Sequence, residues 1–191
     1  MSAHRAITAR NLLLAMLCFY AGLMLWLGSL AFFGIGVAPV IFKTLPSKDL
    51  AGALNAVILH RLNMVEIVGA AFLAVSFALL LGQSRDKRAF VPLVLWGVML
   101  LGWCVYALVL TPQMNALRAQ ISSFDTPDAA SQLLVLTFRG YHQWYSRLVG
   151  ANVLVGLVLL VWQTWRFIGI AHSGEEFTSP AKNSDNRPHA E

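Results

Sequence analysis

Four long stretches without a charged residue constrain this chain more than any other feature of its sequence. They span Asn11–Phe42, Ile67–Ser84, Ala89–Leu117 and Leu148–Trp165. An α-helix needs about 20 apolar residues to cross the hydrocarbon core of a bilayer, so each stretch is long enough to span a membrane. Only 12% of the residues are charged, whereas soluble domains are about 25% charged. We therefore expect an all-α integral membrane protein, a four-helix bundle with short amphipathic interfacial helices.

The same pattern divides the chain into three parts. Residues 1–10 are expected to form a cytoplasmic N-terminus, residues 11–168 a four-span transmembrane domain and residues 169–191 a disordered cytoplasmic tail. The spans are expected at about 12–36, 62–83, 90–110 and 147–167. The tail is polar and contains Pro and Ser, and such a segment buries too little apolar surface to fold alone. A fifth apolar stretch, Ala129–Phe138, is too short to cross and is expected to be interfacial or re-entrant.

The distribution of basic residues predicts the orientation of the spans. Of the 14 Lys and Arg residues, eight lie in the N-terminal segment, the second loop and the C-terminal segment, and the other six lie in the two remaining loops. Because cytoplasmic segments carry the excess of Lys and Arg, both termini are expected in the cytoplasm, with the protein in the plasma membrane. The net charge of +5 then reflects topology and contact with the lipid bilayer. The sequence contains no RNA- or DNA-binding module, so nucleic acid is not an expected partner.

Two prolines lie where the first and third apolar stretches end. Pro39 cannot donate a backbone hydrogen bond and disfavours helix at the residue before it, so the first span is expected to end in the Gly34–Gly36 region, with a bend. Pro112 has two interpretations: a new helix begins at Thr111, or one continuous helix is kinked. Ser47 is a suitable N-cap for an amphipathic helix that leads into the second span.

Glu66 is the only acidic residue inside a predicted span, and an ionisable group in a membrane needs a physical reason. Ala70, Ala74 and Ala78 follow it at intervals of four residues, which places small side chains on one helix stripe. Small residues let helices approach closely in lipid. We therefore expect Glu66 to point into the bundle. The small-residue faces are expected to pack within the chain or against a second copy in a homo-oligomer.

Asn152 is the expected counterpart of Glu66 on the fourth span. When Arg61-Leu62 is aligned with Arg147-Leu148, Glu66 falls opposite Asn152, which indicates a duplicated helical hairpin. The candidate site of Glu66, Asn152 and Arg147 has two interpretations. Glu66 binds a proton or a cation, or it is neutral or paired with a neighbouring Arg or with Asn152 and fixes the helix register. We favour the second, because one acid near an interface can be hydrated or paired at low cost.

His60, Met64 and His142 form a candidate metal or haem site. His60 and Met64 are four residues apart and share a helix face, and His142 lies at the outer end of the fourth span. Imidazole and thioether ligands suit Cu(I) or haem iron. The alternative is that the His residues make interfacial contacts and that Met fills space between helices. The sequence has no CxxCH, HxxxH or Met-rich pattern, so we expect no cofactor, with haem or copper as the alternative.

The sequence contains no nucleophile elbow, P-loop, zinc-binding pattern or dinucleotide-binding turn. We therefore do not expect an enzyme. The first hypothesis is a non-catalytic structural or accessory membrane protein. The alternatives are a membrane protein that handles a small solute or a metal ion such as copper, and a haem-linked redox membrane protein.

The chain also carries a series of short motifs between Leu14 and Trp165. They are Trp26-x-Gly28, Ala38-Pro39-x-x-Phe42, Leu45-Pro46, the Ala51-Gly52 pair, Leu110–Pro112 with Arg118, and Tyr145–Leu148. In order and spacing, this series resembles the transmembrane-protein-205-like domain family. The resemblance implies a four-helix integral membrane protein of undefined activity, with structural motif residues at Trp26, Gly28, Pro39, Phe42, Ala51, Gly52 and Pro112.

Overall fold

Helices make up nearly all of the chain that the structure describes, which confirms the all-α prediction. The computed structural model describes residues 8–81 and 90–178, with residues 171–178 described by their backbone alone. The first long helix comprises α1 (Ala9–Leu23), the π-helical segment η1 (Met24–Gly28), α2 (Ser29–Ala31), the π-helical segment η2 (Phe32–Val37) and α3 (Ala38–Thr44). The second is α4 (Lys48–Leu81). The third comprises α5 (Phe90–Trp103), the π-helical segment η4 (Cys104–Leu110) and α6 (Thr111–Arg118), and the fourth is α7 (Ala129–Thr178).

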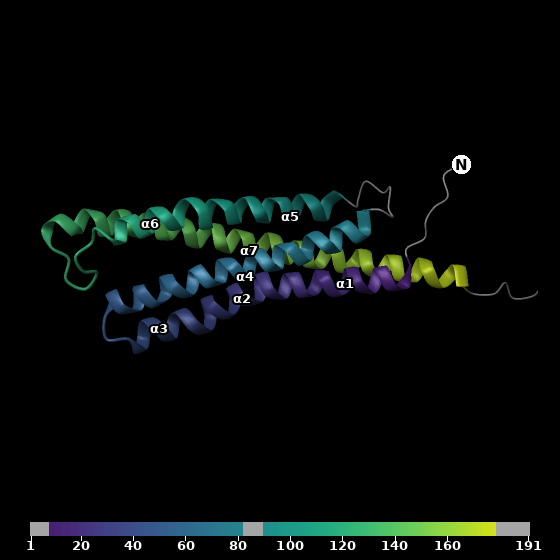
Figure 1. The fold of residues 1–191 in the computed structure, drawn as a ribbon, viewed down its shortest axis with the longest axis horizontal. Coiled ribbons are helices and arrows are strands. Elements are labelled where there is room, and N and C mark those ends of the chain that lie inside the picture. Colours follow the sequence, from purple (N-terminus) through teal and green to yellow (C-terminus); the bar gives the residue numbers. More distant parts are fainter. Residues whose placement is uncertain (1–7, 82–89, 179–191) are drawn as a thin grey trace, which may run out of the picture.

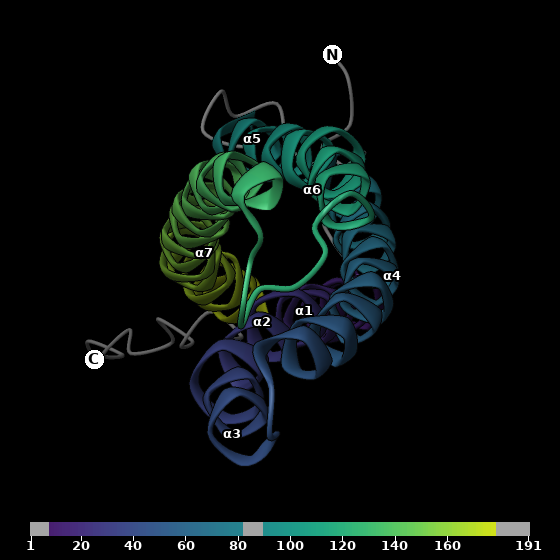
Figure 2. The ribbon, with the colours of Figure 1, turned by 90° about the vertical axis from the view of Figure 1, so that its left-hand side faces the viewer.

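The four long helices form two antiparallel hairpins that lie side by side (Figure 1). α1 packs mainly on α4, and α5 packs mainly on α7. Seen along the bundle, the helices surround a common axis, with α4 and α7 on opposite sides (Figure 2). The start of α1 and the end of α7 lie at one end, which we call the terminal end. The turn between α3 and α4 and the loop between α6 and α7 lie at the other end, the loop end.

Apolar side chains cover the outer faces of the helices as well as the interior. Leu73, Met99 and Leu159 are fully buried in the core. The exposed large apolar side chains include Ile35, Leu101, Leu133, Leu154 and Trp165. Each of the four long helices is long and apolar enough to cross a membrane. Such a surface would favour aggregation in water but suits a lipid solvent, so the fold indicates a multi-pass membrane protein.

Both prolines lie inside continuous helices. Pro39 and Pro112 each occupy the second residue of the α-helical segment that follows a π-helical segment. A π turn pairs each N–H with the carbonyl five residues back, so the widened backbone accommodates a proline without breaking the helix. The first helix therefore does not end in the Gly34–Gly36 region, as expected from Pro39, but continues to Thr44. For Pro112, the continuous helix is the correct interpretation.

Two further boundaries differ from the sequence prediction. Ala129–Phe138 is not a separate interfacial or re-entrant piece, because it forms the first turns of α7. The predicted disordered tail is also helical as far as Thr178, since extending an existing helix adds one hydrogen bond for each residue fixed. Residues 179–191 of the tail lie outside the described residues, as do residues 1–7 and the charged loop at 82–89.

The small-residue stripe of α4 also differs from prediction. Ala70 is buried, but Ala74 is half-buried and Ala78 is exposed. An α-helix turns by about 100° per residue, so every fourth side chain is rotated by about 40° beyond a full turn. A row of residues spaced by four therefore drifts away from the helix interface. The buried stripe follows alternating three- and four-residue steps instead. It includes Ser76, whose Oγ donates to the Ala15 carbonyl oxygen at 2.8 Å.

Candidate functional site

Glu66 lies inside the bundle near the middle of α4, and its side chain has no exposed surface. It belongs to the buried stripe of α4, which continues one turn on at Gly69 and Ala70 and two turns on at Leu73. Positions three or four residues apart share one face of a helix. The structure therefore directs the carboxyl of Glu66 towards the other helices.

Tyr106 connects Glu66 to Asn152. The Tyr106 side chain, on η4, is fully buried, and its hydroxyl donates a hydrogen bond to Oε1 of Glu66. Nδ2 of Asn152, on α7, donates to the Tyr106 hydroxyl oxygen at 3.3 Å and to the Met99 carbonyl oxygen at 3.1 Å. One chain of hydrogen bonds therefore joins α4, the third long helix and α7. We call Glu66, Tyr106 and Asn152 the polar bridge.

Two tryptophans complete the surroundings of the Glu66 carboxyl. The side chains of Trp26, on η1, and Trp103, at the end of α5, are among the groups that act on this carboxyl. Their indole N–H groups are buried and donate no hydrogen bond to any acceptor among the described residues. Tyr145 of α7 packs edge to face on Tyr106, with ring centroids 5.5 Å apart. Side chains from the first and third long helices thus act on one carboxyl, and two of them lie on π-helical segments.

Several oxygen atoms at the polar bridge are buried without a donor. Oε2 of Glu66 and Oδ1 of Asn152 accept no hydrogen bond from the part of the chain that the structure describes. The same holds for Oδ1 of Asn63, one turn before Glu66 on α4. Leaving a buried polar atom without a partner costs about 1–3 kcal/mol. The bridge is therefore a concentration of polar atoms, only partly satisfied, within an apolar core.

Arg147, the third residue of the predicted site, lies apart from the bridge. It is exposed, and its guanidinium carbon stands 5.3 Å from the centre of the Trp144 ring. Five residues separate Arg147 from Asn152, which corresponds to a rotation of about 140° beyond one full turn of the helix. The two side chains therefore leave α7 in different directions. The structure brings Glu66 and Asn152 together through Tyr106 and does not bring Arg147 to them.

The candidate metal ligands also lie outside the polar bridge. His60 and Met64 are on the exposed side of α4. His142 lies on α7 in a row of rings, with centroid distances of 6.3 Å to Phe138 and 6.5 Å to Tyr145. Within residues 8–81 and 90–178, no three His, Cys, Asp or Glu side chains are grouped so that they could hold a metal ion. His60, Met64 and His142 are therefore surface or ring-stacking residues in this arrangement.

At the loop end, the segment between α6 and α7 is fastened to the start of α4. The Asp125 carboxylate accepts from the backbone N–H of Lys48 at 2.9 Å and of Asp49 at 3.4 Å. In return, the Asp49 carboxylate accepts from Ser123 Oγ at 2.6 Å and from the Phe124 N–H at 2.8 Å. The N–H groups at a helix start have no partner within the helix, so carboxylates are stabilising there. We call this reciprocal capping the loop clasp. The predicted N-cap is also confirmed, because Ser47 Oγ accepts from the Leu50 N–H at 3.1 Å.

The residues of the family motifs fall into two main regions. Trp26 is fully buried beside the polar bridge, and Gly28 ends the same π-helical segment. At the loop end, Ala51 is buried, and a Cβ added to Gly52 would lie 3.4 Å from the guanidinium of Arg118. Arg118 also donates to a backbone carbonyl oxygen of the loop clasp at 2.9 Å. The other motif residues are exposed on the helices: Pro39, Phe42 and Pro112.

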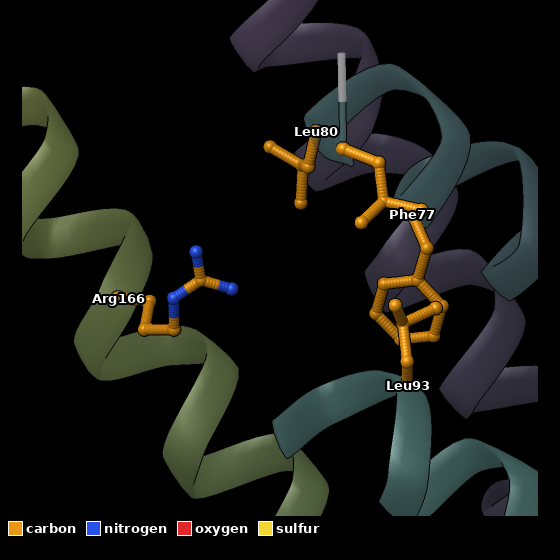
Figure 3. A pocket seen from close by; sticks show the side chains of 5 residues that line it. Phe77, Leu80, Leu93 and Arg166 are labelled. Atoms are coloured by element: carbon orange, nitrogen blue, oxygen red, sulfur yellow. The ribbon is translucent and has the colours of Figure 1, made fainter. Parts of the chain in front are cut away.

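A small pocket opens between α4, α5 and α7 near the terminal end. Arg166 of α7 points into it, towards Phe77 and Leu80 of α4 and Leu93 of α5 (Figure 3). Nη1 of Arg166 donates to Oε1 of Gln163 at 3.3 Å. The lining is apolar apart from the guanidinium, and it includes none of the residues predicted as a site.

Tyr106 and Trp103 are the two site residues that sequence reasoning missed. Both lie in the charge-free stretch Ala89–Leu117, where a Tyr or a Trp is readily interpreted as packing bulk. The signal that could have identified Tyr106 is the position of its polar hydroxyl inside a membrane span. A phenol hydroxyl inside a span has no water to bind, so it needs a partner on a neighbouring helix. Glu66 and Asn152 were the polar groups at a suitable depth.

Comparison with known proteins identifies a family. A family model described as "Domain of unknown function (DUF4149)" matches residues 21–123, slightly more than half of the chain. The matched segment contains Trp26, Glu66, Trp103 and Tyr106, and it ends before α7 and Asn152. No curated protein and no solved structure matches the chain.

Proposed function

The chain belongs to the DUF4149 family, whose description assigns no activity, and we propose from its geometry that it is a non-catalytic structural or accessory protein of the cytoplasmic membrane. One observation carries the proposal. Tyr106 links Glu66 on α4 to Asn152 on α7 inside a bundle whose outer faces are apolar.

The polar bridge supports a role in fixing the register of the helices. In lipid, no hydrophobic effect drives one helix onto another, so apolar faces alone discriminate weakly between registers. A slide of α4 by one turn would move Glu66 by about 5.4 Å and separate it from the Tyr106 hydroxyl. Each polar atom left unpaired in the core costs about 1–3 kcal/mol. The bridge therefore disfavours alternative packings of the same four helices.

Two substitutions of Glu66 test this role. Glu66→Gln keeps an oxygen that accepts from Tyr106, so we expect its free energy of unfolding to stay close to that of the wild type. Glu66→Leu is similar in size but leaves the Tyr106 hydroxyl without an acceptor, so we expect a loss of about 1–3 kcal/mol. The measurement is unfolding of the purified full chain in mixed micelles. Equal stability of the two variants would contradict a register role for the bridge.

We also propose that both termini are cytoplasmic. Arg10 and Arg166 at the terminal end support this orientation, as do the basic residues in the sequence of residues 82–89. A reporter fused to the C-terminus tests it, and a reporter active only outside the cytoplasm would contradict it.

Association of copies through exposed small-residue faces is a separate proposal. The mass of the purified complex in detergent tests that association.

The resemblance to the transmembrane-protein-205-like domain family is a further part of the proposal. Its support is that two separate motifs meet at the loop end, where Gly52 packs against Arg118. We expect a bulky residue in place of Gly52 to displace the Arg118 side chain, because the nearest guanidinium atoms lie 3.4 Å from an added Cβ. The displaced guanidinium would lose its bond to the Asp49 carbonyl oxygen. Unfolding of Gly52→Leu and of Arg118→Ala in mixed micelles should then show similar losses of stability, and unchanged stability in Gly52→Leu would remove this support.

A second candidate function is the handling of a small solute or a metal ion. It is favoured by the buried oxygen atoms of Glu66 and Asn152 that lack donors among the described residues. Metal analysis and an optical spectrum of the purified protein separate the two candidates, and the spectrum also tests a haem-linked redox role. Stoichiometric copper or a haem spectrum, lost in His142→Ala, would favour the second candidate. Protein without bound metal or haem favours the first.

A further inference from the structure

The carboxyl of Glu66 is surrounded by neutral groups. The side chains that act on it are those of Tyr106, Trp26 and Trp103, and Tyr145 is the other titratable group that faces it. Among the described residues of η1, α5, η4 and α7, no Lys, Arg or His is part of these surroundings. An ionised carboxylate without a counter-charge in an apolar interior is strongly disfavoured. A neutral carboxylic acid avoids that cost.

The hydrogen-bonding pattern fits a carboxyl that carries a proton. Because Tyr106 donates to Oε1, that atom serves as the carbonyl oxygen of the acid, and Oε2 is available to hold the proton. An O–H group at Oε2 then needs an acceptor. The Oδ1 atoms of Asn63 and Asn152 are buried acceptors that receive no hydrogen bond from the described residues. Asn63 lies one turn before Glu66 on α4, and Asn152 bonds to the same Tyr106 hydroxyl, so these two oxygens are the candidate acceptors for that O–H group.

The same surroundings also tolerate the ionised form while a proton is exchanged. The Tyr106 hydroxyl remains a donor to Oε1, and the side chains of Trp26 and Trp103 also act on the carboxyl without carrying a charge. A neutral donor such as the Tyr106 hydroxyl stabilises an oxyanion without a cation.

We propose that Glu66 is an exchangeable proton site in the core of the bundle, with the proton on Oε2 and the Tyr106 hydroxyl fixed to Oε1. The inference names the ligand of the polar bridge and rests on the proposed function only in requiring that the bridge forms. With the proton bound, the bridge is neutral and joins three helices. Loss of the proton places a charge between them, so the packing of the bundle responds to proton binding.

Infrared spectroscopy of the full chain in lipid vesicles at neutral pH tests the proposal. We expect a carbonyl stretch from a protonated carboxylic acid, a band that exposed carboxylates do not give. Transfer to D2O should shift the band, because the proton is exchangeable. Glu66→Gln should remove the band, whereas Asp125→Asn, which alters an exposed carboxylate, should leave it. In Tyr106→Phe the band should move to higher frequency, since the carbonyl oxygen loses its donor.

Each result separates this proposal from the register role. Absence of the band in the wild type would overturn the proton site, even if the Glu66 variants change stability as expected. A band that does not shift in D2O would overturn exchange. Loss of the band on adding sodium chloride, but not choline chloride at equal concentration, would show a cation site instead. Where Glu66→Gln fails to fold, the deuterium shift and the Tyr106→Phe shift in a folded protein still decide the question.

Discussion

Gly22 of α1 and Gly69 of α4 meet backbone against backbone. A Cβ added to either glycine would lie 2.8 Å from the carbonyl oxygen of the other. These oxygens cannot yield without moving a whole helix, so an alanine at either position forces α1 and α4 apart. We expect Gly22→Ala and Gly69→Ala each to lower the free energy of unfolding by about 1–3 kcal/mol. Denaturation of the purified protein in mixed micelles measures the change.

Gly97→Ala is the matched control for this contact. Gly97 lies inside α5, and nothing stands within 4 Å of the position its Cβ would take. Alanine favours helix over glycine by about 1 kcal/mol, so this variant should be as stable as the wild type or more stable. A loss at Gly97 equal to that at Gly22 would show that the effect does not come from helix contact.

Tyr106 and Asn152 are expected to contribute to stability as a coupled pair. Tyr106→Phe removes the hydroxyl that donates to Glu66 and accepts from Asn152, and Asn152→Leu removes the second of these bonds. In a double-mutant cycle, residues in one hydrogen-bond network show a coupling of about 0.5–3 kcal/mol. Unfolding of the wild type, both single variants and the double variant gives the coupling energy.

Tyr20→Phe with Asn152→Leu is the control cycle. The Tyr20 hydroxyl is bonded to Thr164 at 3.1 Å, away from the polar bridge. Distant sites without a shared partner are additive within about 0.3–0.5 kcal/mol. If the Tyr106 cycle is also additive within that range, Tyr106 does not bridge the helices in the membrane.

The helix content of this chain follows from its charge pattern, because lipid penalises charges so heavily that their positions bound the apolar stretches. The positions at which the helices end do not follow in the same way. Pro39 indicated an end for the first helix, yet the π-helical turn before it lets the backbone continue to Thr44. Hydropathy contains no information on a widened turn, which depends on how the whole hairpin packs.

The buried site was only half visible in the sequence for a related reason. Glu66 could be predicted because one acid in an apolar run is conspicuous, and Asn152 because it matched Glu66 in an internal alignment. Arg147 was predicted with them as a charged partner of Glu66, but five residues along a helix turn its side chain to a different face from that of Asn152. Tyr106 could not be predicted in the same way, because an aromatic ring in a span ordinarily has a packing role. The sequence alone shows the type of each residue but not the direction in which its side chain faces.

The loop clasp is expected to hold the start of α4 in place. Asp125→Ala removes the carboxylate that accepts from the Lys48 and Asp49 N–H groups, and loss of such a cap costs about 1 kcal/mol. Because the clasp also fixes the loop, we expect faster proteolysis between α6 and α7 as well as lower stability. Thr126→Ala is the control, since Thr126 contributes only its backbone N–H to the clasp, donated to Ser123 Oγ. Equal proteolysis of both variants would contradict the capping role.

The start of α7 should loosen in acid. The Asp128 carboxylate accepts from the backbone N–H of Ser131 at 2.7 Å, and hydrogen bonds from the side chain and backbone of Ser131 hold the pKa of Asp128 below its ordinary value of 3.8. A carboxyl whose pKa is lowered in the folded state contributes its full stabilisation above the ordinary pKa, here above pH 3.8. This contribution is lost as the pH falls through the folded-state pKa. Hydrogen exchange of the Ser131 amide, measured against pH, should therefore show protection that declines below that range. Asp128→Asn keeps a capping oxygen that does not titrate, so its protection should not show this decline, and the same decline in both proteins would assign the effect to another group.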